Sequence, residues 1–302
     1  DITGYKSIVI ANHLKKYYRD VYIVGIDDRK LANVFHTNRI DEYIFLDSNT
    51  DYIESINKII NNNKIDLFIP TNSREMELIL LDSSLPKDIL SYYGTYENFN
   101  ILNDKYELSR LCKKLKIKAP LYGTRIEEME FPFVIKPKIS SSSKGVVYVK
   151  RQKDLHKVKF DSNVHVAQEY IKGVGVGYSV FAKNGKILVG SGHKRLAEFP
   201  ISGGSSMYRE TYKNPQMIHT AKKLLSATNW SGFAMFEFKL TNSDELYLIE
   251  VNPRIWGSIN QGLKNGINYF SHIVKSEPKS FNKRKHDLKT YHSPGIYLSI
   301  LK

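Results

Sequence analysis

Apolar and polar positions divide the chain into two parts with different periodicity. In the first hundred residues, three continuous apolar runs have the length of buried parallel strands: 21–26, 43–46 and 65–69. Three segments between and beside them carry apolar residues at helical spacing: 7–18, 51–60 and 73–81. This alternation predicts a doubly wound α/β unit over residues 1–97. The chain enters its first helix directly after Asp1-Ile-Thr-Gly4, so we expect the first strand of this unit to lie upstream of residue 1.

From about residue 98 the pattern becomes richer in strands. A helix is predicted over 104–115, with Cys112 packed on its apolar face. Three short strands are predicted to form a small lid subdomain at about 121–171: 133–136, 146–149 and 164–168. Asn184-Gly185 is a strong two-residue turn signal and predicts a hairpin of residues 178–182 with 187–191. We expect residues 98–302 to form one domain that contains this lid.

A second hairpin carries the most informative pattern, with strands at 233–240 and 245–251. If Ser243-Asp244 is a two-residue turn, Glu237 lies directly opposite Glu250. The other face then pairs three apolar positions: Phe236 with Val251, Phe238 with Ile249, and Leu240 with Tyr247. Two opposed carboxylates repel unless a cation lies between them.

Asn252 adds a third oxygen on the face that carries the two carboxylates. Two carboxylates and one amide oxygen are ligands that Mg²⁺ prefers, and such a site can hold a nucleoside triphosphate. A half-exposed hairpin with two solvated glutamates is the alternative interpretation. Arg254 and the loop described next favour the metal site.

The segment Pro137–Gly145 follows a predicted buried strand and contains four serines. Its backbone N–H groups and hydroxyls suit the binding of an anion, and Lys136 and Lys144 supply positive charge. A flexible surface loop is the alternative. The glycine-rich run 173–177 resembles a linker whose backbone could hydrogen-bond a nucleobase edge, which is a weak signal because such turns are common.

Composition restricts the class of protein further. The formal net charge is +14, but Lys and Arg are spread along the 302 residues without a zinc-finger spacing or an aromatic RNA-binding signature. We therefore expect attraction for anionic ligands and no nucleic-acid partner. The single cysteine excludes a disulfide framework and fits a reducing cytoplasm. No apolar run approaches membrane-spanning length, so we expect no membrane contact.

Taken together, these motifs resemble an ATP-grasp enzyme, in the branch of carboxylate–amine ligases related to the carbamoyl-phosphate synthase large subunit. The resemblance covers almost the whole chain, and the order and spacing of the motifs are more specific than any one of them. It implies an N-terminal doubly wound parallel-sheet domain followed by an ATP-grasp fold, in which two α+β subdomains clasp the nucleotide.

The resemblance implies roles for individual residues. The implied contacts to nucleotide are the following: Lys105, Lys136, Ser140, Ser141, Ser142, Ser143, Lys144, Gly145, Gln168, Glu169, Tyr170 and Ile171. The implied metal ligands are Glu237, Glu250 and Asn252, and Arg254 is implied to stabilise charge on the transferring phosphoryl group. The family usually places a ribose-binding Glu where this chain has Gly177, so ribose recognition is weaker or comes from elsewhere.

The segment 193–206, with Arg209 beyond it, borders the acceptor pocket in the resembled branch. The residues implied for substrate are Arg195, Gly203, Gly204, Ser205, Ser206 and Arg209, and Arg195 is also implied to be catalytic, together with Arg254. A guanidinium fork binds a carboxylate in bidentate fashion, and paired glycines allow close approach of backbone to a ligand. The alternative is a solvated edge strand followed by a turn, which we prefer for His193 and Lys194 individually. Trp256 is predicted to be a packing residue.

The implied reaction is phosphorylation of a carboxylate by ATP to an acylphosphate, from which an amine displaces phosphate to form an amide. Cofactors are ATP and Mg²⁺, with two metal ions expected and Mn²⁺ as an alternative. Expected substrates are a small carboxylate and amine of amino-acid or peptide type. Carbamate phosphorylation and thiol ligation remain open within the same fold, as does a homodimer. The rival from another class is a basic nucleotide- or nucleic-acid-binding protein without turnover.

Overall fold

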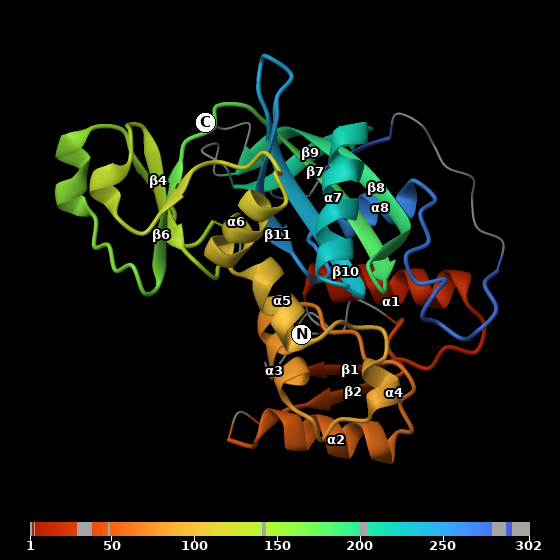
Figure 1. Ribbon diagram of the computed structural model, residues 1–302. Coiled ribbons are helices and arrows are strands. Elements are labelled where there is room, and N and C mark those ends of the chain that lie inside the picture. Colours follow the sequence, from red (N-terminus) through yellow and green to blue (C-terminus); the bar gives the residue numbers. More distant parts are fainter. Residues whose placement is uncertain are drawn as a thin grey trace.

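The structure is a computed structural model that describes residues 2, 4–28, 38–47, 49–140, 143–199, 204–279 and 288–291. Figure 1 shows three parts, with a large sheet and its helices in the upper half, a small sheet at the left, and the N-terminal unit below. The α-helices are α1 Tyr5–Tyr17, α2 Tyr52–Asn62, α3 Ser73–Leu81, α4 Lys87–Leu90, α5 Tyr96–Asn103, α6 Lys105–Lys114, α7 Pro215–Ala227 and α8 Ile259–Lys264. The strands are β1 Val24–Asp27, β2 Glu42–Phe45, β3 Tyr122–Gly123, β4 Phe133–Pro137, β5 Val147–Val149, β6 His165–Glu169, β7 Val174–Lys183, β8 Lys186–Phe199, β9 Ser205–Thr211, β10 Gly232–Leu240, β11 Leu246–Asn252 and β12 Lys289–Tyr291.

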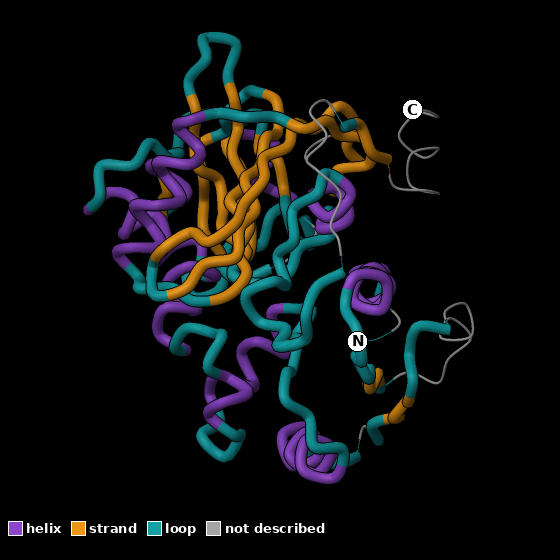
Figure 2. The backbone as a smooth tube through the Cα atoms, turned by 90° about the vertical axis from the view of Figure 1, so that its right-hand side faces the viewer, coloured by secondary structure: helices purple, strands orange, loops and turns teal. Residues whose placement is uncertain are grey.

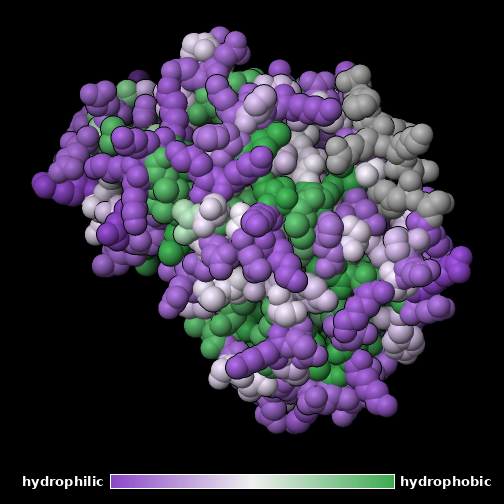
Figure 3. All heavy atoms as spheres, turned by 45° about the vertical axis from the view of Figure 1, so that its right-hand side comes forward, coloured by the Kyte–Doolittle hydropathy of each residue, from purple (hydrophilic) through white to green (hydrophobic). Residues whose placement is uncertain are grey.

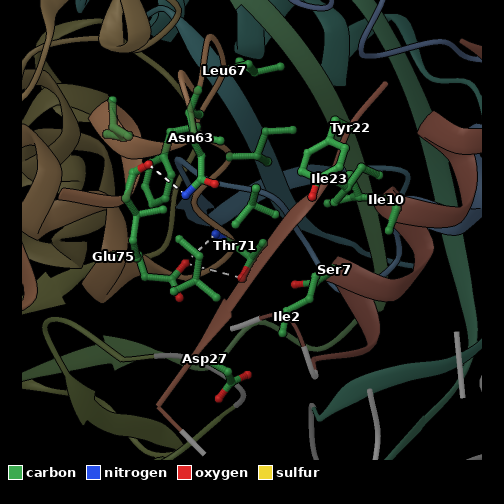
Figure 4. A pocket seen from close by; sticks show the side chains of 18 of the residues that line it. Ile2, Ser7, Ile10, Tyr22, Ile23, Asp27, Asn63, Leu67, Thr71 and Glu75 are labelled. Atoms are coloured by element: carbon green, nitrogen blue, oxygen red, sulfur yellow. Dashed lines mark hydrogen bonds between the residues drawn. The ribbon is translucent and has the colours of Figure 1, made fainter. Parts of the chain in front are cut away.

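The N-terminal unit contains the predicted helices, but fewer paired strands than its apolar runs predict. β1 and β2 pair in parallel, from Val24 opposite Glu42 to Asp27 opposite Phe45. The predicted strand at 65–69 pairs with neither, so that prediction is wrong. A cavity of about 720 Å³ lies instead between this segment, β1 and α1. Figure 4 shows side chains of Ile10, Ile23 and Leu67 among those that line it.

Side-chain caps explain where several helices begin. At the start of α2 the Asp51 side chain accepts a hydrogen bond from the backbone N–H of Glu54. At the start of α3 the Asn72 side chain accepts one from the backbone N–H of Glu75. Asp104 accepts from two N–H groups at the start of α6. Each cap satisfies backbone donors that have no partner inside the helix. The cap of α6 fixes Lys105 at the first helical position.

The small sheet is antiparallel in the order β3-β6-β4-β5. One of its faces packs a separate core of Phe133, Ile135, Val149 and Ala167. Side chains alternate between the faces of a strand, so Lys136 and Gln168 lie on the opposite face. This small sheet, with the 3-10 helices η2 Ile126–Glu128 and η3 Gln152–Lys157, occupies the position predicted for the lid.

The large sheet is antiparallel in the order β11-β10-β7-β8-β9-β12. Its hairpin β7–β8 turns at Asn184-Gly185, both with positive φ, as predicted. α7 covers one face, and α8 contacts both β8 and α1. In Figure 2 these strands gather in the upper part of the molecule, and α1, the first helix of the N-terminal unit, is seen end-on below them near the N-terminus.

The main core runs from the N-terminal helices into the large sheet as one cluster of buried apolar side chains. Cys112 is buried there, and burial raises the pKa of its thiol to about 12, so its predicted packing role is confirmed. Trp256 is also buried and packs edge-on against Tyr269, as predicted. Figure 3 shows hydrophilic side chains over most of the visible face and apolar ones in the recess between the upper and lower parts. We retain the division into 1–97 and 98–302, with a lid at about 121–171, as a proposal.

Candidate functional site

Glu237 of β10 and Glu250 of β11 are paired directly across the hairpin, as the sequence predicts. Phe236 lies opposite Val251, also as predicted. Beyond this point the predicted register is wrong, because Phe238 pairs with Leu248 and Leu240 with Leu246. The turn is one residue longer than expected, with Thr241 N donating to Glu245 O, and a β-bulge next to Glu237 restores the register. The longer turn shifts the register by one residue, and the bulge shifts it back, so the predicted pairing of the two carboxylates is correct.

Three polar groups hold the two carboxylates together. Arg195 of β8 forms an ion pair with Glu237. Asn252 donates from Nδ2 to both carboxylates, at 3.2 Å to Glu237 and 3.3 Å to Glu250. Lys105 Nζ lies 3.7 Å from a Glu250 oxygen. Positive charge therefore reaches the pair both from α6 and from β8.

The environment separates the acidities of the two glutamates. Burial raises the pKa of Glu237, and the Arg195 guanidinium only partly opposes this. Burial also acts to raise the pKa of Glu250, but Lys105 and Lys136 outweigh it and the net shift is downward. Glu250 is thus the carboxylate that the two lysines keep ionised.

Lys105 and Lys136 are both almost fully buried, which is rare for lysine without an ion pair. Lys105 Nζ donates to Ser140 Oγ at 3.3 Å. Burial lowers the pKa of Lys136 to about 8, although Glu250 acts to raise it. The two lysines come from α6 and β4 and converge on the same carboxylate, as expected of a triphosphate site.

The structure describes part of the serine-rich loop that follows β4. Ser140 lies beside Lys105, and Ser143 and Gly145 have positive φ. Lys144 is exposed. Ser141 and Ser142 lie outside the described residues. Positive φ at two positions gives the loop a sharp turn of the kind that can present backbone N–H groups to an anion.

The predicted hinge begins on the inner face of the lid. Gln168 is buried, and its Oε1 has no hydrogen-bond partner. Glu169 accepts from Leu121 N at 2.9 Å, which fixes its carboxylate away from the site centre. Tyr170 is partly exposed and packs edge-on against Tyr148, while Ile171 is buried. An unpartnered buried amide oxygen beside an aromatic pair fits contact with a nucleobase.

The glycine-rich run beyond the hinge is a strand and not the predicted linker. Residues 174–177 open β7, in which valines and glycines alternate between the two faces; Val176 is buried and Val174 is exposed at the start of the strand. A Cβ at Gly175 would lie 2.6 Å from Glu198 Oε1 and 2.7 Å from Arg195 Cδ. A Cβ at Gly177 would lie 2.5 Å from the His193 ring. The glycines therefore make room for side chains of β8 to lie across β7.

The predicted substrate segment forms β8 and β9, which lie inside the large sheet and not at its edge. Arg195 is bound to Glu237 and Glu198, and its Nη1 donates to Gly204 O at 3.2 Å. Gly203 lies outside the described residues. Ser205 and Ser206 pair in register with Phe199 and Glu198. Arg209 lies directly opposite Arg195 and is buried.

Arg254 connects the site to the N-terminal unit. Its Nη2 donates to Asn252 Oδ1 at 2.7 Å, and its Nε donates to Ser73 Oγ at 3.0 Å. Lys6 of α1 donates to Thr71 O. Burial, and then the Arg254 charge, lower the pKa of Lys6 to about 8. Lys6 and Ser73 were missed by the sequence analysis, because neither stands in a motif and their proximity to Arg254 exists only in the folded chain.

The donor set fits a hard divalent cation. Two ionisable carboxylates and one amide face one another, and oxygen ligands of this kind suit Mg²⁺ or Mn²⁺. Within the described residues, no group of three or more His, Cys, Asp or Glu side chains forms a metal cluster, so Asn252 would have to supply the third protein ligand. Arg195 and the Asn252 amide hydrogens now contact the oxygens that a cation would use.

Comparisons with known proteins agree with this geometry. A family model described as an ATP-grasp domain matches residues 102–258, which is more than half of the chain. The chain therefore belongs to the ATP-grasp family of ATP-dependent enzymes, with ATP and magnesium as cofactors, as its motifs predict. The predicted fold class is confirmed as well. No curated protein matches the sequence.

Solved structures share the fold at low sequence identity. A biotin carboxylase from Campylobacter jejuni in complex with an ATP analogue has a TM-score of 0.69 at 14% identity, covering 89% of this chain and 68% of its own. An L-amino acid ligase from Bacillus licheniformis has a TM-score of 0.64 at 15% identity, covering 87% of this chain and 68% of its own. An N5-carboxyaminoimidazole ribonucleotide synthetase from Thermotoga maritima has a TM-score of 0.65 at 15% identity, covering 95% of this chain and 77% of its own.

In the part of the chain that the structure describes, no helix combines the length and the hydropathy that a membrane crossing requires.

Proposed function

We propose that this protein is an ATP-dependent carboxylate–amine ligase, in the branch related to the carbamoyl-phosphate synthase large subunit. The observation that carries the proposal is the Glu237–Glu250 pair, with Lys105 and Lys136 converging on Glu250 and Arg254 bound to Asn252. These residues provide cation ligands, phosphate-binding charge and a guanidinium at one place. The named activities of an L-amino acid ligase and of an N5-carboxyaminoimidazole ribonucleotide synthetase with this fold support C–N bond formation.

In this proposal the nucleotide lies between the lid and the large sheet. Lys105, Lys136 and the loop from Ser140 to Gly145 bind the phosphates, and the hinge residues Gln168 to Ile171 bind the base. Glu237, Glu250 and Asn252 hold Mg²⁺, which, when bound, offsets phosphate charge. The segment from Arg195 to Arg209 borders the acceptor.

The proposed chemistry has two steps. An oxygen of the substrate carboxylate attacks the γ-phosphorus, the bond from that phosphorus to the bridging oxygen breaks, and ADP leaves. The amine nitrogen then attacks the acyl carbon, inorganic phosphate leaves, and the nitrogen loses a proton. Arg254 lies beside Asn252, so its guanidinium can stabilise charge as the phosphoryl group moves. The other side chains position the reactants and exclude water.

A screen of carboxylate and amine pools with MgATP tests this function. We expect ADP release that depends on carboxylate, together with a product whose mass equals carboxylate plus amine minus water. Glu250→Gln should abolish both. Glu245→Gln is the matched control, because Glu245 lies near the turn of the same hairpin, is exposed, and pairs with Lys118.

The same screen separates the rival interpretations. Nucleotide binding without turnover in any pool would favour a non-catalytic nucleotide-binding protein. ADP release with carbamate or with a thiol acceptor would favour the other reactions open to this fold. AMP as the product would contradict acylphosphate formation. A cytoplasmic location and a homodimer remain predictions.

A further inference from the structure

Arg209 is a buried cation with no acidic partner among the residues that the structure describes. It lies on β9 with 6% of its surface exposed, and its Nε has no hydrogen-bond partner. No carboxylate among the described residues lies within ion-pair distance of it. Burial lowers the pKa of its guanidinium to about 10, and the nearby Arg195 charge adds to this. A buried charge without compensation is costly, so a guanidinium kept in this way indicates a ligand of opposite charge.

The neighbours of Arg209 are donors as well. The register places Arg195 of β8 and Thr290 of β12 directly opposite it, one on each side. Paired positions share a face of the sheet, so all three side chains lie on the face that carries Glu237. The Nε of Arg195 and the hydroxyl of Thr290 also lack partners. Three unpartnered donors on adjacent strands define an anion site.

Arg195 and Arg209 differ in their counter-charges. Arg195 is bound to Glu237 and Glu198, so its charge is already balanced. The group that acts to raise the pKa of Arg209 is the Tyr5 phenol of α1, which accepts a hydrogen bond from Asn260. The uncompensated charge of this region is therefore located at Arg209.

The position of Arg209 separates it from the reacting centre. β9 is three strands from β10 in the order β10-β7-β8-β9, which corresponds to roughly 14 Å between their backbones. A carboxylate that reacts beside Glu237 and Glu250 cannot at the same time be the group held by Arg209 and Thr290. The acid that this site accepts must carry its second anionic group at a distance.

We propose that Arg209 and Thr290 bind a second, non-reacting anionic group, so that the preferred acid substrate is a dianion such as a dicarboxylate or a phosphorylated carboxylic acid. This inference rests on the proposed ligase function. It assigns Thr290 to substrate recognition and gives Arg209 a role distinct from that of Arg195.

Calorimetry with small acids in the presence of MgADP tests the inference. Glutarate, adipate and O-phosphoserine are compared with pentanoate, hexanoate and serine. We expect at least one acid with two anionic groups to bind ten-fold or more tightly than its matched acid with one, and the comparison of dicarboxylates with O-phosphoserine shows which anionic group is preferred. Arg209→Gln should remove the difference and leave the affinity for MgADP unchanged within two-fold.

Thr290→Val should reduce the preference by a few fold, because it removes one donor at nearly constant volume. Arg125→Gln is the control, because Arg125 is exposed on the lid and pairs only with the exposed Glu128 among the described residues. Removal of an uncompensated buried charge should also leave the Tm of Arg209→Gln equal to or above that of the parent without ligand. An arginine with only a structural role would instead lower the Tm when replaced.

The outcomes separate this inference from the function on which it rests. Failure to bind MgADP would contradict the proposed function itself. Ligation of dianionic acids with an unchanged KM in Arg209→Gln would overturn only the second anion site. Equal binding of dianions and monoanions by the parent protein would overturn it as well. Arg209→Lys, which keeps the charge, serves if the glutamine variant does not fold, and it should retain part of the preference.

Discussion

Arg195 of β8 reaches Glu237 of β10 across the strand that lies between them. It can do so because β7 carries glycine at positions 175 and 177, on the face that both side chains share. The guanidinium partly opposes the rise that burial causes in the pKa of Glu237. A glycine pattern that resembles a linker in the sequence therefore has a steric role in the sheet.

Gly175→Ala should break this arrangement. The added Cβ would meet Glu198 and Arg195 at contacts far shorter than van der Waals distance. We expect a loss of about 1–3 kcal/mol in the free energy of unfolding, as for other overpacked sites. Gly257→Ala is the control, because nothing lies within 4 Å of a Cβ built there. Denaturant unfolding of both variants measures the difference, and equal stability would mean that Arg195 moves aside without cost.

Lys6 should make stability depend on pH in the alkaline range. Its pKa is about 8 in the folded protein and 10.5 in the reference state, so between these values the unfolded chain binds more protons. Stability should rise as pH increases from 8 to 10.5, by up to about 3 kcal/mol from this group. Lys6→Met should lose that rise and be the more stable protein at pH 7.

The Lys6 experiment compares variants at each pH, since other groups titrate in the same range. Lys58→Met is the control, because Lys58 is 70% exposed and pairs only with Glu54 one turn away among the described residues. If the stability difference between Lys6→Met and the parent is constant from pH 7 to 10.5, Lys6 is solvated and does not feel Arg254.

Nucleotide affinity should depend on a divalent cation. Glu237 and Glu250 repel a triphosphate unless a cation lies between them. Calorimetry of ATP with Mg²⁺ and with a chelator should show tight binding only in the first case. Equal affinity in both conditions would remove the metal assignment of Glu237, Glu250 and Asn252.

Arg254 and Arg195 should have separable kinetic roles. Arg254→Ala should lower kcat strongly with little change in the KM for ATP, because its guanidinium acts on charge that develops during transfer. Arg195→Ala should chiefly raise the KM for the carboxylate, because Arg195 lies in the proposed acceptor segment. Because Arg195 forms an ion pair with Glu237, a proposed metal ligand, the Arg195→Ala variant should also bind the metal more weakly. Steady-state kinetics at varied Mg²⁺ distinguish the two, and an unchanged carboxylate KM in Arg195→Ala would place the acceptor elsewhere.

The centre of the candidate site could be predicted from the sequence, because it depends on residues that are close together along the chain. β-formers, turn residues and alternation place Glu237 opposite Glu250, and an error in the turn is corrected by a bulge that no local pattern reveals. Helix caps and the Asn184-Gly185 turn were likewise predictable, because they depend on neighbours in sequence.

Long-range contacts were not predictable in this way. Lys6 lies beside Arg254, which is distant in sequence, and Arg195 pairs with Glu237 across an intervening strand. The segment at 65–69 has the composition of a strand, yet composition does not supply a partner edge, and it borders a cavity instead. The pairing of strands depends on contacts between segments that are distant in sequence, so the pattern within one segment cannot predict it.

Transfer of oxygen from the acid to phosphate tests the central proposal most directly. The acid identified in the screen is labelled with ¹⁸O in its carboxylate, and the phosphate released during amide formation is analysed by mass spectrometry. Acylphosphate formation predicts one ¹⁸O in each inorganic phosphate, because the attacking carboxylate oxygen stays with phosphorus. Phosphate that carries no label, while amide forms, would contradict the account.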